Sequence, residues 1–89
     1  CAPYATFGTE ALSHNVVRAL EGRRACLIAN HGVVCLGETL DKALFLAREV
    51  EQLARIYGLC LAMGEPDILP DEEMARVLEK FTTYGPRER

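Results

Sequence analysis

Three stretches of the chain repeat apolar residues with the spacing of an amphipathic helix. The longest predicts a helix over residues 39–63, which begins at the N-cap candidate Thr39 and stops before Gly64 and Pro66. Charged residues fill most of the opposite face, so this helix is expected to cover a core on one side only. Its apolar stripe consists of Leu40, Ala43, Leu44, Ala47, Val50, Leu53, Ala54, Tyr57 and Leu61.

Two shorter helices flank the rest of the chain. One is predicted over residues 9–21, between the N-cap candidate Thr9 and Gly22, which adopts a left-handed cap at little cost. The other is expected to open at Pro70, whose missing N–H costs nothing in a first helical turn. Its apolar face consists of Met74, Val77, Leu78 and Phe81.

Two short apolar runs, residues 25–29 and 33–36, read as strands joined tightly through Asn30, His31 and Gly32. Their apolar character on both faces indicates a strand pair covered from both sides. Residues 1–8 contain Pro3 and Gly8 and are expected to be extended or loop. Two strands do not make a stable sheet alone. We therefore expect an α/β fold in which residues 1–89 form the C-terminal portion of a single domain, with the N-terminal half absent from this sequence.

The composition of the chain argues against several classes of protein. The 89 residues carry a net charge of -3 with scattered basic residues, which argues against a nucleic-acid partner. The sequence does not show the positively charged segment followed by an apolar run that is typical of a signal peptide. Charged residues interrupt its longest apolar stretch, so no membrane-spanning helix is expected. Cys26, Cys35 and Cys60 lie inside apolar runs and are expected to be buried, reduced thiols, which favours a cytoplasmic location.

His31 is the strongest candidate for chemistry. A histidine between two strands is aimed by a rigid scaffold, and neutral imidazole is a common zinc ligand. The alternative is a turn histidine that hydrogen-bonds its own loop. A local zinc site of Cys26, His31 and Cys35 is disfavoured, because residues in extended strands rise about 3.3 Å each and hold both thiols well back from the turn. The other histidine, His14, reads as a surface residue.

Three segments carry a family resemblance: Ala2–Thr9 (APYATFGT), Ala29–Val34 (ANHGVV) and Leu78–Gly85 (LEKFTTYG). Together they resemble the class II aldolase/adducin family, and the first and last are typical of its fuculose-phosphate aldolase branch. The resemblance spans residues 1 to about 85. It implies the C-terminal part of a three-layer α/β/α domain, here a short strand pair plus three helices.

The resemblance also implies an activity, namely zinc-dependent aldol cleavage of a sugar 1-phosphate of the fuculose 1-phosphate type to dihydroxyacetone phosphate and an aldehyde. His31 matches the last of three zinc-binding histidines. The other two, and the glutamate that acts as general acid and base, would lie in the absent N-terminal half, so no catalytic residue is assigned here and the fragment alone should be inactive. Phe7, Phe81 and Tyr84 match aromatic residues near the substrate. The resemblance further implies a homotetramer with active sites between subunits.

Two alternatives stay open at this point. One is a related sugar-phosphate epimerase or dehydratase of the same family. The other is a non-catalytic, adducin-like assembly module that keeps the fold without the metal. A His-x-His pair preceded by an acidic residue, upstream of this sequence, would favour an enzyme.

Overall fold

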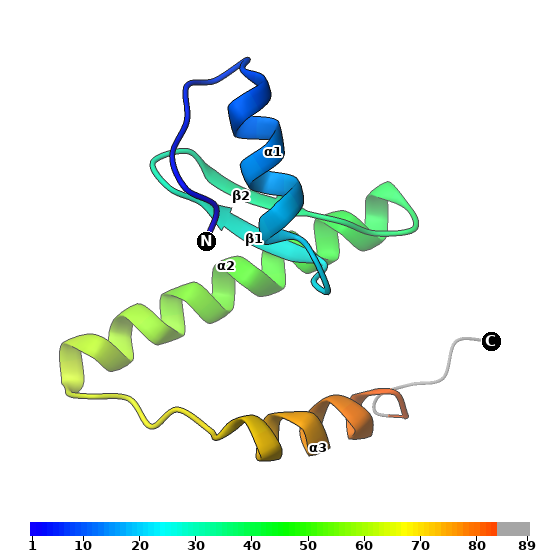
Figure 1. Cartoon of the computed structure of the whole chain (residues 1–89). Coiled ribbons are helices and arrows are strands. Elements are labelled where there is room, and N and C mark those ends of the chain that lie inside the picture. Colours follow the sequence, from blue (N-terminus) through cyan, green and yellow to red (C-terminus); the bar gives the residue numbers. More distant parts are fainter. Residues whose placement is uncertain (84–89) are drawn as a thin grey trace.

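The computed structural model describes residues 1–83 and confirms the predicted order of elements. Figure 1 shows that order along the chain. The elements are α1 (Glu10–Ala19), β1 (Ala25–Ile28), β2 (Gly32–Cys35), α2 (Leu40–Met63) and α3 (Asp71–Phe81). The largest difference in bounds concerns α1, which ends two residues before the predicted limit because the chain already turns after Leu20. Gly22 lies in that turn with a φ of 68°, the left-handed conformation expected of it.

The helix termini are set by local side chains, as predicted. The hydroxyl oxygens of Thr9 and Thr39 accept hydrogen bonds from the backbone N–H groups of Leu12 and Lys42, at 3.3 and 3.2 Å. The N–H of Gly64 closes α2 by donating to the carbonyl of Cys60 at 3.1 Å. Pro70 differs slightly from its predicted place: it is the residue just before α3, with an extended ψ of 157°, and not the first helical residue.

β1 and β2 form an antiparallel hairpin. Cys26 pairs with Val34 and Ile28 with Gly32, and the ladder continues beyond the strands because the N–H of Leu36 donates to the carbonyl of Arg24 at 2.7 Å. β2 therefore begins one residue earlier than predicted and includes Gly32. Neighbouring residues of a strand point to opposite faces, so this register fixes which side chains face each helix.

The N-terminal segment lies along the other edge of β1. Ala2 forms a parallel bridge with Ile28, in which its N–H donates to Leu27 at 2.7 Å and its carbonyl accepts from Ala29 at 3.0 Å. This pairing confirms the predicted extended conformation and makes β1 the middle strand of a small three-stranded arrangement. Ala2 is completely buried, and within residues 1–83 Cys26, at 8% exposure, is the other buried apolar residue.

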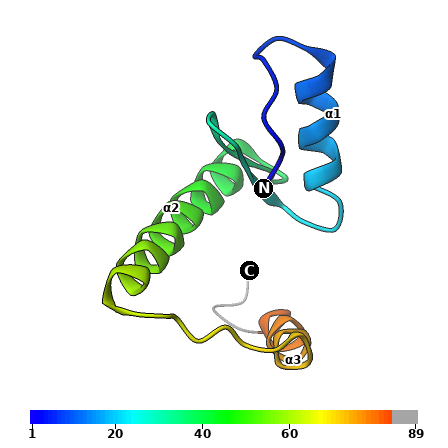
Figure 2. The same cartoon turned by 60° about the vertical axis from the view of Figure 1, so that its left-hand side comes forward.

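α1 and α2 lie on opposite sides of the hairpin, which gives a helix–strand–helix layering (Figures 1 and 2). Both helices contact β1, and α2 also contacts β2. The predicted coverage of both faces is only partly correct. Leu27 and Val33, paired across the two strands, are 50% and 41% exposed. α1 and α2 therefore shield only part of the hairpin.

The C-terminal half of α2 extends beyond the hairpin, and α3 stands apart at the end of a connecting segment (Figures 1 and 2). The described residues thus leave much of the apolar stripe of α2 uncovered. Its exposed members include Leu53, Tyr57 and Leu61, and the exposed apolar residues Ile56, Leu59 and Met63 of α2 lie outside the stripe. Despite this apolar surface, none of the helices within residues 1–83 is long and apolar enough to cross a membrane.

Candidate metal-ligand site at the hairpin turn

The residues of the turn between β1 and β2 favour the backbone conformation that the turn requires. Asn30 adopts a φ of 66°, in the left-handed region that asparagine tolerates better than most residues with a side chain. Gly32 follows with a φ of 144°, which only glycine adopts readily. The N–H of His31 donates to the carbonyl of Ile28 at 3.0 Å and closes the turn. The turn therefore holds His31 in a defined position at the end of the hairpin.

The imidazole of His31 contacts the N-terminal segment. Its Nε2 atom lies 2.8 Å from the carbonyl oxygen of Ala5, a hydrogen bond across 26 positions of sequence. The ring also stacks on Tyr4, with centroids 5.3 Å apart and planes inclined by only 9°. This bond departs from the alternative in which the histidine bonds its own loop, because the acceptor belongs to a distant segment. The residue remains exposed to solvent.

Sequence analysis did not identify Tyr4 and Ala5 as partners of His31. The contacts arise because Ala2 pairs with β1, which carries residues 4 and 5 past the hairpin turn. No local spacing reports a pairing over this separation. The only signal in the sequence is that Tyr4 and Ala5 follow Pro3 in a segment expected to be extended, and this signal does not indicate which residue they contact.

His31 suits a zinc site as a single ligand. A neutral imidazole has one nitrogen with a free lone pair, and zinc readily accepts it. Within residues 1–83, the surroundings of His31 included, no three His, Cys, Asp or Glu side chains lie close enough together to hold a metal ion. The register also places Cys26 and Cys35 on opposite faces of the hairpin, so their thiols cannot converge on His31. A complete site needs further ligands from outside these residues.

The predicted aromatic residues lie in different parts of the structure. Phe7 is 80% exposed and lies two residues beyond Ala5, in the turn before α1. Phe81 is half exposed at the end of α3, which Figures 1 and 2 show well away from the hairpin. Tyr84 lies outside the described residues. The fold of residues 1–83 therefore does not place Phe81 close to His31.

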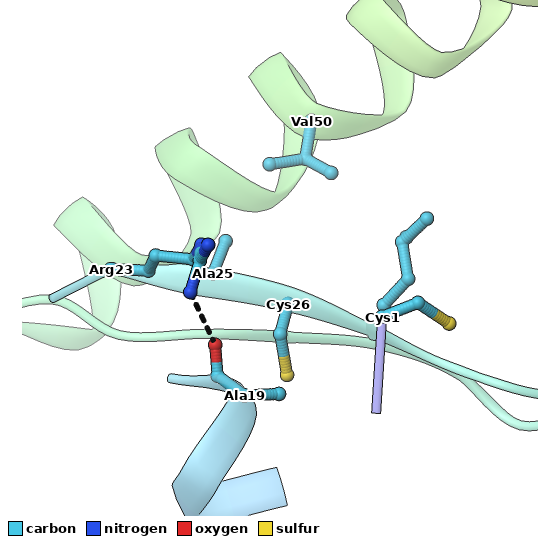
Figure 3. Close-up of a pocket in the computed structure, with 7 residues that line it drawn as sticks. Cys1, Ala19, Arg23, Ala25, Cys26 and Val50 are labelled. Carbon is cyan, nitrogen blue, oxygen red and sulfur yellow. Dashed lines mark hydrogen bonds between the residues drawn. The ribbon is translucent and has the colours of Figure 1, made fainter. Parts of the chain in front are cut away.

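A separate hollow lies between α1, β1 and α2, and Figure 3 shows its lining. The side chain of Cys26 points toward Ala19 of α1, whereas Val50 of α2 lies on the opposite side. Arg23 donates from its guanidinium to the carbonyl of Ala19 at 3.4 Å. His31 does not line this hollow, which is therefore distinct from the candidate ligand site.

Comparisons with known proteins find relatives that share this fold. A solved structure titled L-fuculose 1-phosphate aldolase superposes with a TM-score of 0.86 and 49% identity, over 91% of this chain and 38% of that chain. An L-fuculose phosphate aldolase from Escherichia coli is 54% identical over 88 residues, which is 98% of this chain and 41% of the relative. A 5-methylthioribulose-1-phosphate/5-deoxyribulose-1-phosphate aldolase from Rhodospirillum rubrum is 58% identical over 82 residues, covering 92% and 37% respectively.

The chain thus spans about two fifths of the length of these relatives. Residues 1–58, the part that contains α1, the hairpin and most of α2, match the model of the class II aldolase and adducin N-terminal domain. That match includes His31 and the segment that contacts it. On the combined strength of the family match, the relatives and the shared fold, the chain belongs to the class II aldolase and adducin family.

Proposed function

We propose that the intact protein is a zinc-dependent aldolase that cleaves a sugar 1-phosphate of the fuculose 1-phosphate type to dihydroxyacetone phosphate and an aldehyde. The observation that carries this proposal is the placement of His31 in a rigid turn, within a chain 54% identical to an L-fuculose phosphate aldolase. The chain would supply the C-terminal portion of the domain and one zinc ligand. The other ligands and the general acid/base would come from the part of the longer protein that this chain does not include.

The proposed chemistry suits a neutral ligand. A bound divalent metal supplies electrophilic stabilisation of the oxygens that gain negative charge when a carbon–carbon bond breaks. His31 binds without a charge of its own and so leaves the metal's charge uncancelled. The turn residues Asn30 and Gly32 orient the imidazole, and Gly32 adds no side chain that would obstruct an approaching group. The contribution of this chain to catalysis is therefore binding and orientation.

Phe7, Phe81 and Tyr84 are proposed to contact the substrate in the assembled protein. Phe7 and Phe81 both expose much of their surface in this chain, so each is accessible to a ligand or to a neighbouring subunit. We propose a homotetramer with active sites at subunit interfaces, which would allow a residue of α3 to serve a site on another copy. Cys26 is a buried free thiol, which fits the proposed cytoplasmic location.

A second substrate is favoured by a specific observation. The relative from Rhodospirillum rubrum is 58% identical and is named for 5-methylthioribulose 1-phosphate and 5-deoxyribulose 1-phosphate. These compounds and fuculose 1-phosphate share a phosphorylated ketose end and differ in the part released as the aldehyde. Cleavage of each by the intact protein should therefore be measured side by side.

The test compares His31→Ala with His14→Ala in the full-length protein. His14 is an exposed residue of α1, which makes it a matched control for loss of an imidazole. We expect His31→Ala to lose zinc and cleavage of both substrates, whereas His14→Ala keeps both properties. Retained zinc and activity in His31→Ala would overturn the proposal. Zinc binding without cleavage in the unaltered protein would instead favour an epimerase or dehydratase, and absence of both would favour an assembly module.

A further inference from the structure

We propose that Thr9 is a positioning residue for Phe7, and that its hydroxyl sets the direction in which the Phe7 ring meets the substrate. The part of this inference that concerns the substrate rests on the proposed function. The conformation of the turn that carries Phe7 depends only on contacts within this chain.

The first step concerns that turn. Residues 6–9 form it directly before α1, with Phe7 and Gly8 at its centre. The hydroxyl of Thr9 donates to the carbonyl of Thr6 at 2.6 Å and closes the turn. Gly8 has a φ of 74°, the conformation that a type II turn requires at its third residue. A side-chain hydrogen bond therefore holds the two ends of the turn together.

The second step concerns the hydroxyl itself. The same oxygen is the N-cap of α1, since it accepts from the N–H of Leu12 at 3.3 Å. A hydroxyl has one proton to donate and two lone pairs, so it can make both bonds at once. Thr9 thus joins the turn to the first residues of a regular helix, which a side chain that only accepts hydrogen bonds would not do.

The third step concerns how the Phe7 ring is held. The side-chain amide of Asn15, in α1, donates to the carbonyl of Pro3 at 3.1 Å. α1 and its cap therefore hold the N-terminal segment at Pro3 and again at Thr6. Phe7 follows the second attachment and exposes 80% of its surface. Its direction is thus set by the backbone of the turn and not by packing around the ring, as in binding groups on loops held by a rigid scaffold.

The variants separate the two bonds of the Thr9 hydroxyl in the full-length protein. Thr9→Asp keeps an N-cap that accepts from Leu12, but its carboxylate has no proton to donate to Thr6. Thr9→Ser keeps both bonds. Thr39→Asp, at the N-cap of α2, is the matched control for an aspartate cap. Thermal unfolding is expected to be similar for all three variants, because each keeps its cap.

The first measurement follows the turn without any substrate. Nitrogen-15 relaxation of protein labelled at phenylalanine gives the backbone order parameter of Phe7, whose signal Phe7→Leu identifies. We expect about 0.85, typical of a rigid backbone, in the unaltered protein, Thr9→Ser and Thr39→Asp, and a fall toward about 0.6 in Thr9→Asp. Gly8→Ala strains the same turn without a clash and should lower the value too. A Phe7 amide as rigid in Thr9→Asp as in the unaltered protein would overturn the inference.

The second measurement is the ratio of kcat/KM for fuculose 1-phosphate to kcat/KM for 5-deoxyribulose 1-phosphate. We expect Thr9→Asp to change this ratio in the same direction as Phe7→Leu, by about 2- to 10-fold, the size expected for one hydrogen bond. Thr9→Ser and Thr39→Asp should leave it unchanged. The double variant Phe7→Leu/Thr9→Asp should behave like Phe7→Leu alone, because Thr9 acts through the ring. A further change of the ratio in the double variant would contradict this.

Failure of the proposed function gives a different result. If the unaltered full-length protein cleaves neither substrate, the proposed function is wrong, and the order parameter of Phe7 still decides whether Thr9 holds the turn. If Thr9→Asp loosens the turn while the ratio of kcat/KM values stays the same in an active enzyme, the inference that Thr9 sets the direction of Phe7 toward the substrate is overturned and the proposed function stands.

Discussion

The rings of Tyr4 and His31 lie nearly parallel, with centroids 5.3 Å apart. Tyr4 belongs to the extended N-terminal segment and His31 to the turn of the hairpin, so the stack joins two of the three segments that carry the family resemblance. It uses the ring of Tyr4, which is also partly exposed to solvent. The energetic contribution of the stack can therefore be separated from that of the tyrosine hydroxyl.

Tyr4→Leu in the full-length protein is expected to weaken zinc binding about 2- to 10-fold, because an aromatic pair contributes about 0.5–1.5 kcal/mol beyond the area it buries. Tyr4→Phe keeps the ring and should bind zinc like the unaltered protein. Competition with a chelator of known affinity measures both variants. Equal zinc affinity in all three proteins would show that the stack does not orient the ligand.

Asn30→Val is expected to destabilise the protein by about 1–2 kcal/mol, because a β-branched residue fits poorly at a φ of 66°. Asn30→Gly accepts this conformation and should change the free energy of unfolding by less than about 1 kcal/mol, since glycine gains freedom mainly in the unfolded chain. Denaturant unfolding of the metal-free protein measures both. A valine variant as stable as the glycine variant would mean that the turn relaxes without cost.

Gly37→Ala is expected to destabilise the protein by about 1–3 kcal/mol, in the range of overpacked positions. A Cβ at position 37 would clash with the backbone nitrogen of Ala43, so the start of α2 would have to shift. Gly58→Ala is the matched control, because its Cβ meets no atom within 4 Å and alanine favours a helix by about 0.5–1 kcal/mol. Opposite signs of the two changes in thermal unfolding are the expected result, and destabilisation by both would contradict it.

Tyr84→Phe and Phe81→Leu are expected to change the preference for the aldehyde released, with little effect on zinc content, if these residues contact the substrate as proposed. The measurement is kcat/KM for fuculose 1-phosphate and for 5-deoxyribulose 1-phosphate, with zinc content determined on the same samples. Leu78→Met, a volume-conserving change on the same helix as Phe81, serves as control. A ratio of the two kcat/KM values that stays unchanged would remove that residue from the proposed site.

The sequence predicted the local features of this fold well. Thr9 and Thr39 cap their helices as expected, because a cap depends on residues only three positions apart. The hairpin and its turn were also predicted, since Asn30 and Gly32 have conformational preferences of their own. Pro70 was misplaced by one residue, because its fixed φ suits both the first helical position and the one before it.

The long-range features could not be predicted in the same way. The pairing of Ala2 with Ile28 joins residues far apart in sequence, and nothing in either segment alone specifies it. The partners of His31 depend on that pairing, so Tyr4 and Ala5 were missed although His31 itself was identified. The family resemblance supplied what pattern analysis lacked at His31, namely a reason to prefer a metal ligand over an ordinary turn residue.

The attachment of the N-terminal segment to the hairpin has a dynamic consequence. The N–H of Ala29 donates to the carbonyl of Ala2. Three residues further along the same segment, the carbonyl of Ala5 contacts the imidazole of His31. Detachment of the segment would break this bond and release the imidazole in a single local opening, with a free energy below that of global unfolding. The rate of hydrogen exchange at the Ala29 amide therefore reports how often this local opening releases the His31 imidazole in the metal-free protein.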